Sequence, residues 1–408
     1  MNQDFATPAD VRARNLSLTL NIIRESGSLT RASLIETTHL SATTISSLVN
    51  VLIASDFVHE AGTGLSSGGR RPVVLEFNYD ARSILGVDMG ASHITSVLMN
   101  LSGKIRARLT RSVDVVNKPE DALNVLRSMI FQIMSQSGDH TEDLLGVGYT
   151  IPAPLTNPET GEFLTYYMPA WRGIRPVDEM HKIIDAPVYM ENDANAAAMA
   201  ENWWGSGRGF NNMIYIKIGT GVGSGLILDH TIYRGYSGNA GEIGHTTIES
   251  DGRLCRCGNK GCMEAYVGLP GFLKDARRAL ADDPVWKLKL DQLKMIDVIE
   301  EARRGNLACK EVISNAGKYL GIGIANLINL FNPAIVILGG DLTAAGPILM
   351  DSVHLSLRER SMPFESHKDR LILGELGGDA VAIGAATFVL QNAFNETNLY
   401  QTLRRNSN

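Results

Sequence analysis

Long apolar runs are absent from this chain of 408 residues. No stretch approaches the roughly 18 apolar residues that a membrane-spanning helix needs. The N-terminal segment MNQDFATPAD is polar, without the basic and apolar regions of a secretory signal. Hydrophobic residues nevertheless make up 44% of the chain, which is enough for a buried core. We therefore expect a cytoplasmic protein without membrane contact, folded as two or three domains.

Cysteine is scarce, with four residues in the chain, yet three of them fall within positions 255–262. The reducing cytosol disfavours disulfides, and a bridge between Cys255 and Cys257 would be strained. Packed apolar thiols are the alternative, but the flanking residues are polar and rich in glycine. Three thiolates need a fourth ligand for tetrahedral zinc, and the histidine of GEIGH is the best placed. The expected ligands of a structural zinc are His245, Cys255, Cys257 and Cys262.

Lysine is missing from residues 1–80, where six Arg face eight Asp plus Glu and leave a net charge of −2. Helical periodicity recurs at 11–27, 29–40 and 41–56, followed by a strand, a Gly/Ser-rich loop and a strand. This order is typical of a winged helix-turn-helix domain, whose third helix enters the major groove. That helix has Ser41 as its expected N-cap, and the loop GGRRP would form the wing. The expected DNA contacts are Ser41, Thr43, Thr44, Ser46, Arg70 and Arg71.

A small helical module for dimerisation is the alternative for the same residues. Their negative balance leaves little general attraction for phosphates, so any attraction must be local. The chain as a whole, with a net charge of −6, does not indicate nucleic-acid binding either. We favour DNA binding because the element order is specific and two arginines lie in the expected wing.

The pattern changes at Ile84. SILGVDMGASHITSVLMNLSGKI predicts a strand, an Asp/Gly turn and a strand, and NNMIYIKIGTGVGSGLILDHTIYRG repeats this plan about 130 residues later. The repeat predicts a duplicated α/β body with a cleft between its halves. A strand rather than a helix follows the glycines at 219–225, which excludes a dinucleotide fingerprint, and no GK[ST] marks a P-loop. A hairpin whose amides face a phosphate and a plain tight turn are equally supported.

Hydrogen-bonding groups concentrate in four segments: IPAPLTNPETG (151–161), ENDAN (191–195), GEIGH (241–245) and GCMEAY (261–266). A sugar presents several hydroxyls, each a donor and an acceptor, so its buried recognition requires carboxylates and amides. Helix capping is the alternative role for Asp193, and a solvated surface acid is the alternative for Glu242. The expected sugar-binding residues are Asn192, Asp193, Glu242, His245 and Glu264.

The segments GTGVGSGLILDHTIYRGYSGNAGEIGH and GHTTIESDGRLCRCGNKGCME resemble the signature and the zinc-and-sugar loop of the ROK family of bacterial repressors and sugar kinases. The resemblance covers essentially the whole chain. It implies a two-lobed, actin-like, sugar-kinase-type (ribonuclease H-like) α/β body behind an N-terminal all-α winged helix-turn-helix domain. It also implies the zinc ligands and sugar contacts named above, with Asp193 matching the catalytic base of the kinases.

Two departures from the family pattern bear on catalysis. DMGAS at 88–92 stands where the kinases carry an Asp-x-Gly-Gly-Thr turn, and Ala153 stands where glycine is usual. The first change is mild, and the second weakens one expected backbone contact to the sugar. A kinase would hold ATP-Mg with its two turns. The phosphate-binding residues expected in that case are Asp88, Gly90, Gly219, Thr220 and Gly221.

Two functions are therefore predicted, in this order. The first is a sugar-responsive DNA-binding regulator, a repressor of carbohydrate-utilisation genes that binds operator DNA as a homodimer or homotetramer without significant turnover. The alternative is an ATP-dependent, glucokinase-like sugar kinase with a DNA-binding extension. Glucose, xylose and N-acetylated hexosamines all fit the polar residues. The expected division is a DNA-binding domain at 1–80, a smaller lobe at 81–195 completed by 380–395, a larger lobe with the zinc loop at 196–379, and a tail at 396–408.

Overall fold

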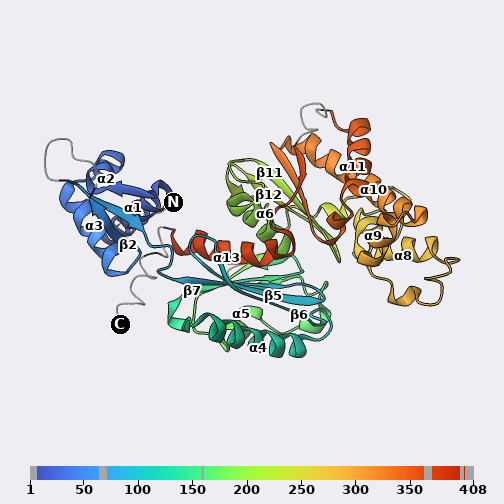
Figure 1. Ribbon diagram of the computed structural model, residues 1–408, viewed down its shortest axis with the longest axis horizontal. Coiled ribbons are helices and arrows are strands. Elements are labelled where there is room, and N and C mark those ends of the chain that lie inside the picture. The colour runs from blue at the N-terminus through green and yellow to red at the C-terminus, as the bar shows by residue number, and fades with distance from the viewer. Residues whose placement is uncertain (1–6, 64–70, 158–159, 363–369, 396–398, 400–408) are drawn as a thin grey trace.

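A computed structural model describes residues 7–63, 71–157, 160–362, 370–395 and 399 of the chain. It consists of an N-terminal unit and two α/β lobes, with the long helix α13 (Ala380–Ala393) lying between the lobes (Figure 1). Arg70, expected at the DNA, and most of the expected tail lie outside the described residues. None of the described helices combines the length and apolarity that a bilayer crossing requires.

Three helices and a small antiparallel sheet make up the N-terminal unit. Its elements are α1 (Pro8–Ser26), β1 (Ser28–Thr30), α2 (Arg31–Thr38), α3 (Ala42–Ala54), β2 (Val58–Thr63) and β3 (Val73–Phe77), and the sheet order is β1-β3-β2. The three expected helices and the expected hairpin are confirmed. Ser41 caps α3, because its Oγ accepts a hydrogen bond from the Thr44 amide at 3.1 Å. Strand β1 is an addition to the expected set and pairs with β3.

The smaller lobe contains a five-stranded mixed sheet. Its elements are β4 (Ser83–Met89), β5 (His93–Asn100), β6 (Ile105–Ser112), α4 (Pro119–Ser137), β7 (Leu144–Ile151), β8 (Leu155–Asn157), β9 (Glu162–Phe163), α5 (Pro176–His181) and β10 (Val188–Asn192). The strand order is β10-β7-β4-β5-β6, with β4, β5 and β6 antiparallel and β7 and β10 parallel to β4. Helices α4 and α5 cover the face opposite α13 (Figure 1).

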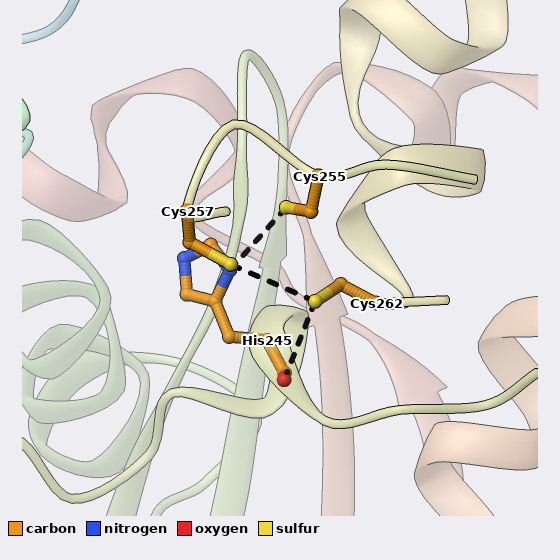
Figure 2. Close-up of side chains that lie close together, drawn as sticks. All are labelled: His245, Cys255, Cys257 and Cys262. Carbon is orange, nitrogen blue, oxygen red and sulfur yellow. Dashed lines mark hydrogen bonds between the residues drawn. The ribbon is translucent and has the colours of Figure 1, made fainter. Parts of the chain in front are cut away.

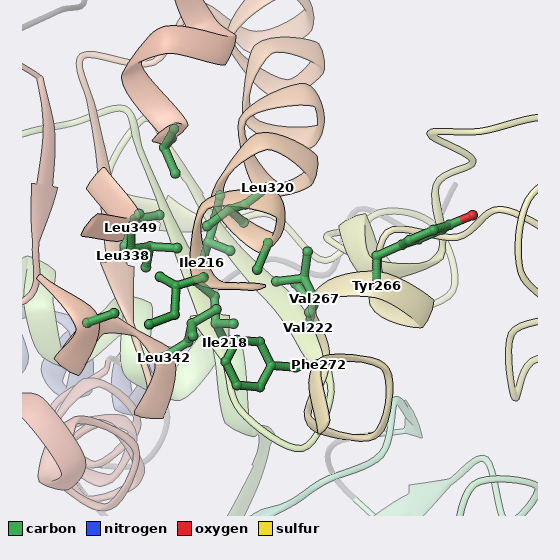
Figure 3. Packing of buried hydrophobic residues seen from close by; sticks show 14 of the residues in the cluster. Ile216, Ile218, Val222, Tyr266, Val267, Phe272, Leu320, Leu338, Leu342 and Leu349 are labelled. Carbon is green, nitrogen blue, oxygen red and sulfur yellow. The ribbon is translucent and has the colours of Figure 1, made fainter. Parts of the chain in front are cut away.

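The larger lobe repeats this plan. Its elements are α6 (Asp193–Trp204), β11 (Met213–Ile218), β12 (Val222–Leu228), β13 (Thr231–Ile232), α7 (Glu264–Val267), α8 (Leu269–Ala279), α9 (Met295–Arg303), α10 (Leu307–Phe331), β14 (Ile335–Gly339), α11 (Pro347–Arg360) and β15 (Leu371–Leu373). The strand order is β13-β12-β11-β14-β15. In each sheet the first strand is central, the next two strands lie on one side of it and the two later strands on the other, so the predicted duplication is confirmed. Apolar side chains of β11, β12 and β14 pack against those of α7, α8, α10 and α11 in its core (Figure 3).

Helices α6 and α13 pack closely because their sequences, ANAAAMA and AVAIGAA, are made of small residues. A Cβ added at Gly384 would lie 1.8 Å from the Ala196 carbonyl oxygen, and one at Gly148 of β7 would lie 1.8 Å from the Ala385 carbonyl oxygen. No larger residue fits at either contact. The close packing fixes α6, which carries Asp193 at its first turn, against both lobes.

The N-terminal unit packs against the end of α13. Its buried residues form one continuous core with the end of α13. The Phe394 ring meets the Phe57 and Phe77 rings edge to face, at centroid distances of 5.7 and 6.0 Å. The buried Ser17 hydroxyl donates a 2.6 Å hydrogen bond to the Phe394 carbonyl. Leu399, assigned above to a tail, is fully buried in the same core.

Candidate effector and metal site

The four expected zinc ligands lie together (Figure 2). His245 ends a short 3-10 turn, Cys255 and Cys257 lie in the following loop, and Cys262 precedes α7. Their ligand atoms all lie within 4.8 Å of one another, and the Sγ atoms of Cys257 and Cys262 are 3.7 Å apart. Tetrahedral zinc with bonds of about 2.3 Å separates two sulfur ligands by about 3.8 Å. The residues therefore fit zinc in both chemistry and spacing.

Burial opposes ionisation of two of the three thiols. It raises the pKa of Cys262 to about 12 and also raises the pKa of Cys255. Zinc binds thiolates and supplies the positive charge that stabilises them, so metal binding to this cluster releases protons. Its structural role would be to fix the loop between His245 and α7.

His245 connects the cysteine cluster to the expected sugar contacts. Its Nδ1 lies 3.7 Å from Cys255 Sγ, while Nε2 lies 3.9 Å from a carboxylate oxygen of Glu242. Burial lowers the pKa of His245, which favours the neutral ring that binds metals. One imidazole can thus bind zinc through one nitrogen and face a ligand with the other.

The expected sugar-binding carboxylates Glu242 and Glu264 lie near this histidine, and Asp193 is near enough to act on Glu242. The pKa of Glu242 is raised to about 7, first by burial and then by the charges of Asp193 and Glu264. The Glu242 side chain is partly buried, with 35% of its surface exposed. The helix-cap alternative for Asp193 is wrong, because Asn192 caps α6: its Oδ1 accepts hydrogen bonds from the amides of Ala194 (2.9 Å) and Asn195 (3.3 Å). Asn192 has only its Nδ2 group left for a ligand.

Glu264 is already engaged by protein donors. Arg256, which lies between two of the expected zinc ligands, donates to its carboxylate at 2.7 and 3.2 Å, and the Val222 amide donates at 3.0 Å. Arg256 also stacks on the Tyr167 ring, and its carbonyl accepts a 3.0 Å hydrogen bond from the Tyr166 hydroxyl. The two tyrosines follow β9 of the smaller lobe. The metal loop thereby contacts both lobes, which the sequence analysis missed although an arginine inside Cys-x-Cys is a visible signal.

The two expected phosphate turns are present as strand connections. Asp88 ends β4 almost fully buried, accepts a 3.2 Å hydrogen bond from Thr150, and lies 3.4 Å from His93 Nε2. Thr220 and its flanking glycines connect β11 to β12, and no helix follows, as predicted. A Cβ at Gly221 would lie 2.5 Å from Glu264 Oε2. A side chain at this position would displace the Glu264 carboxylate from its hydrogen bonds.

Lys217 is a further residue of this region that the sequence analysis missed. Its Nζ lies 2.5 Å from Asp193 Oδ2, and both side chains are largely buried, with 23% and 17% of their surface exposed. A lysine within the otherwise apolar strand MIYIKI was the available signal.

Most of the expected DNA-contacting residues that the structure describes are exposed. Ile45, Leu48, Val49 and Leu52 bury one side of α3, and Ser41, Thr43, Ser46 and Ser47 are exposed on the other, with Thr44 half-buried. Arg71 lies two residues before β3 and is exposed. It lines a hollow together with Thr30 and Arg31. Arg31 is paired with Glu60 at 2.9 Å.

Comparison with known proteins gives some matches to almost the whole chain and others to about three quarters of it. The ROK family profile matches residues 84–392. A xylose repressor of Bacillus spizizenii is 33% identical over 389 residues, which span 95% of this chain and 98% of the repressor. A crystal structure of a ROK family transcriptional regulator, described as a homologue of the Escherichia coli MLC protein, superposes with a TM-score of 0.80 at 27% identity and covers 97% of this chain and 99% of that one.

The shorter match is to a kinase. A ROK family glucokinase from Streptomyces griseus, solved with glucose and AMPPNP, gives a TM-score of 0.66 at 27% identity. It covers 76% of this chain and 99% of its own. The likeness to regulators therefore extends over the N-terminal helices, whereas the likeness to this kinase accounts for the two-lobed body.

Proposed function

Because the chain belongs to the ROK family, we propose that it is a sugar-responsive transcriptional repressor of carbohydrate-utilisation genes. The observation that carries the proposal is a physical connection: the helix that presents Asp193 to the effector site also reaches the N-terminal unit. A xylose repressor matches almost the whole chain, so xylose is the first effector to test.

The N-terminal unit is a winged helix-turn-helix that binds operator DNA. Helix α3 would enter the major groove with its exposed hydroxyl side chains, which are short enough to reach bases and phosphates. Arg71 of the wing would add a local positive charge to a segment that is negative as a whole. Two such units in a homodimer, or four in a homotetramer, would read a palindromic operator.

The effector site holds a sugar among carboxylates and one imidazole. Asp193, Glu242 and Glu264 accept from hydroxyls, and the Nδ2 of Asn192 donates. Zinc bound by His245 and the three cysteines would fix the loop between them. Glu242 comes just before this loop and Glu264 just after it, so the metal would hold both carboxylates in place.

Helix α6 provides the route between the two sites. It begins at Asp193, spans about 18 Å at 1.5 Å per residue, and ends at Trp203 and Trp204. The Arg24 guanidinium of α1 lies over the Trp203 ring at 5.4 Å, and Trp204 donates a 2.8 Å hydrogen bond to Thr387 of α13. A sugar that shifts α6 would thereby shift α1 and with it the spacing of two DNA-binding units.

The kinase alternative has a specific observation against it. Asp193, the residue matching the catalytic base, has one carboxylate oxygen taken by Lys217. The positive charge of the same ammonium group acts on Asp88, the carboxylate expected to bind Mg²⁺, and opposes a second cation there.

The test is operator binding with and without sugar. Duplexes selected from a random pool by the full-length protein serve as probe, and fluorescence anisotropy measures their affinity across a sugar panel. Sequence-selective binding that one sugar weakens supports the proposal. Failure to select any sequence, or selected binding that no sugar changes, contradicts it.

A further inference from the structure

Lys217 stands near the end of β11 and is largely buried. Its cross-strand neighbours in the sheet are Gly223 on β12 and Gly339 on β14, and the Tyr215 hydroxyl occupies the space beside Gly339 where a side chain would begin. The start of α6 approaches on the same side, since a Cβ at Gly223 would lie 3.2 Å from the Ala194 Cβ. The geometry directs the ammonium group onto Asp193, at 2.5 Å.

Three carboxylates from three elements act on this ammonium group. Burial lowers the pKa of Lys217, but the charges of Asp193 at the start of α6, Asp88 at the end of β4 and Asp341 after β14 outweigh it and raise the pKa above its ordinary value. His93, whose Nε2 lies 3.4 Å from an Asp88 carboxylate oxygen, is near enough for the Lys217 charge to act on it. Lys217 is thus held charged among carboxylates from both lobes.

This arrangement differs from what phosphoryl transfer requires. A divalent cation must neutralise phosphate oxygens, and a positioned carboxylate must accept the proton of the attacking hydroxyl. Mg²⁺ binds carboxylates at about 2.1 Å and keeps several waters, so it needs both space and negative charge. The ammonium group of Lys217 donates a hydrogen bond to one carboxylate oxygen of Asp193, and its charge repels a second cation at close range.

We propose that Lys217 is an internal cation that takes the place of a divalent metal at this carboxylate cluster, so that the site binds a sugar without phosphorylating it. The inference rests on the sugar-binding role of the same site proposed above. Lys217 and Asp193 form a donor–acceptor pair, and one sugar hydroxyl can donate to Asp193 while accepting from Lys217. Lys217 is in this sense a specificity-determining residue.

The experiment removes the charge and asks whether a metal enters. Zinc-loaded full-length protein is titrated with Mn²⁺ in a calorimeter as wild type, Lys217→Met and Lys217→Arg. We expect the Met variant to gain one Mn²⁺ site, at least about tenfold tighter than any in the wild type, and the Arg variant to gain none. Adding Asp193→Asn to Lys217→Met should abolish the new site, which assigns it to this cluster.

Several outcomes would overturn the inference: a wild type that binds Mn²⁺ as tightly as the Met variant, a Met variant without a new site, or a new site that survives Asp193→Asn. If the Met variant does not fold, Lys217→Gln replaces it, because the amide can donate to Asp193 without carrying charge. The titration contains neither DNA nor sugar, so its failure is distinct from failure of the operator assay. Sugar-dependent ADP release by the wild type would also refute the inference, while leaving operator binding to be judged separately.

Discussion

The contact between Arg24 and Trp203 should transmit the effector signal, and its removal should uncouple the two sites. The Arg24 side chain is only 19% exposed, and its Nε has no hydrogen-bond partner among the described residues. The guanidinium pairs with Glu25 of the same helix at 3.3 Å, and its carbon lies 5.4 Å from the Trp203 ring, which is its contact with the body. Arg24→Met retains an apolar side chain of similar length and removes the charge.

The magnitude follows from the burial of the pair. A partly desolvated cation–π contact contributes about 1–2 kcal/mol, and coupling between allosteric sites is typically about 1–3 kcal/mol. If the contact is made in only one of the two states, its loss removes a large part of the coupling. At about 1.4 kcal/mol per factor of ten, the ratio of operator affinities without and with sugar should fall by about 5- to 30-fold.

The assay is operator anisotropy with and without saturating sugar, together with sugar titration of free and operator-bound protein. Linkage requires the effect of operator on sugar affinity to fall by the same factor. Arg12→Met, the same change at an exposed position of α1, is the matched control. A double variant with Trp203→Leu should lose little more than Arg24→Met alone. An Arg24→Met protein that keeps the wild-type ratio would refute the proposed route.

Four further outcomes are expected. Cys257→Ser should reduce bound zinc, measured by elemental analysis, from about one per chain. It should also lower the melting temperature and the sugar affinity, because the loop next to the sugar contacts Glu242 and Glu264 loses its support. Arg71→Ala should weaken operator binding by about 1–3 kcal/mol in anisotropy, with sugar affinity unchanged; equal DNA affinity would remove Arg71 from the interface. Asp193→Asn should cost about 1–3 kcal/mol of sugar affinity by calorimetry and leave operator binding without sugar intact. The hydrogen bond to Asp88 raises the pKa of His93, so its stabilisation should be full below about pH 6.5 and decline as pH rises through the higher folded-state value; His93→Gln should flatten that decline in thermal melts.

Local patterns were sufficient to predict the elements that sequence periodicity dictates. The apolar spacing of α3 and its Ser41 cap are properties of a single segment, and so is the hairpin that follows β11. The cysteine cluster could also be predicted from the sequence, because tetrahedral zinc requires four Cys or His ligands close together in space. Strand β1 was missed because three residues carry no periodicity and form a strand only through pairing with β3.

Contacts between distant segments were beyond this reasoning. Lys217 and Asp193 are 24 residues apart and meet only because β11 and α6 lie side by side. Arg256 could be seen in the sequence, but its pairing with Glu264 depends on the path of the metal loop. The contact of Arg24 with Trp203 depends on how the N-terminal unit docks on the body, for which no local rule exists.

The core that joins the N-terminal unit to the end of α13 bears on how such chains can be rebuilt. A protein shortened to the region that the family profile matches, 84–392, would lack both Phe394 and the aromatic residues that cover it. Shortened only at its start, it would present Phe394 and Leu399 to water as an apolar patch that favours aggregation. A chimaera that exchanges DNA-reading units between two regulators must therefore carry the last turn of α13 and the residues after it along with the N-terminal segment. The N-terminal unit and the residues at the end of α13 act as one part of the fold.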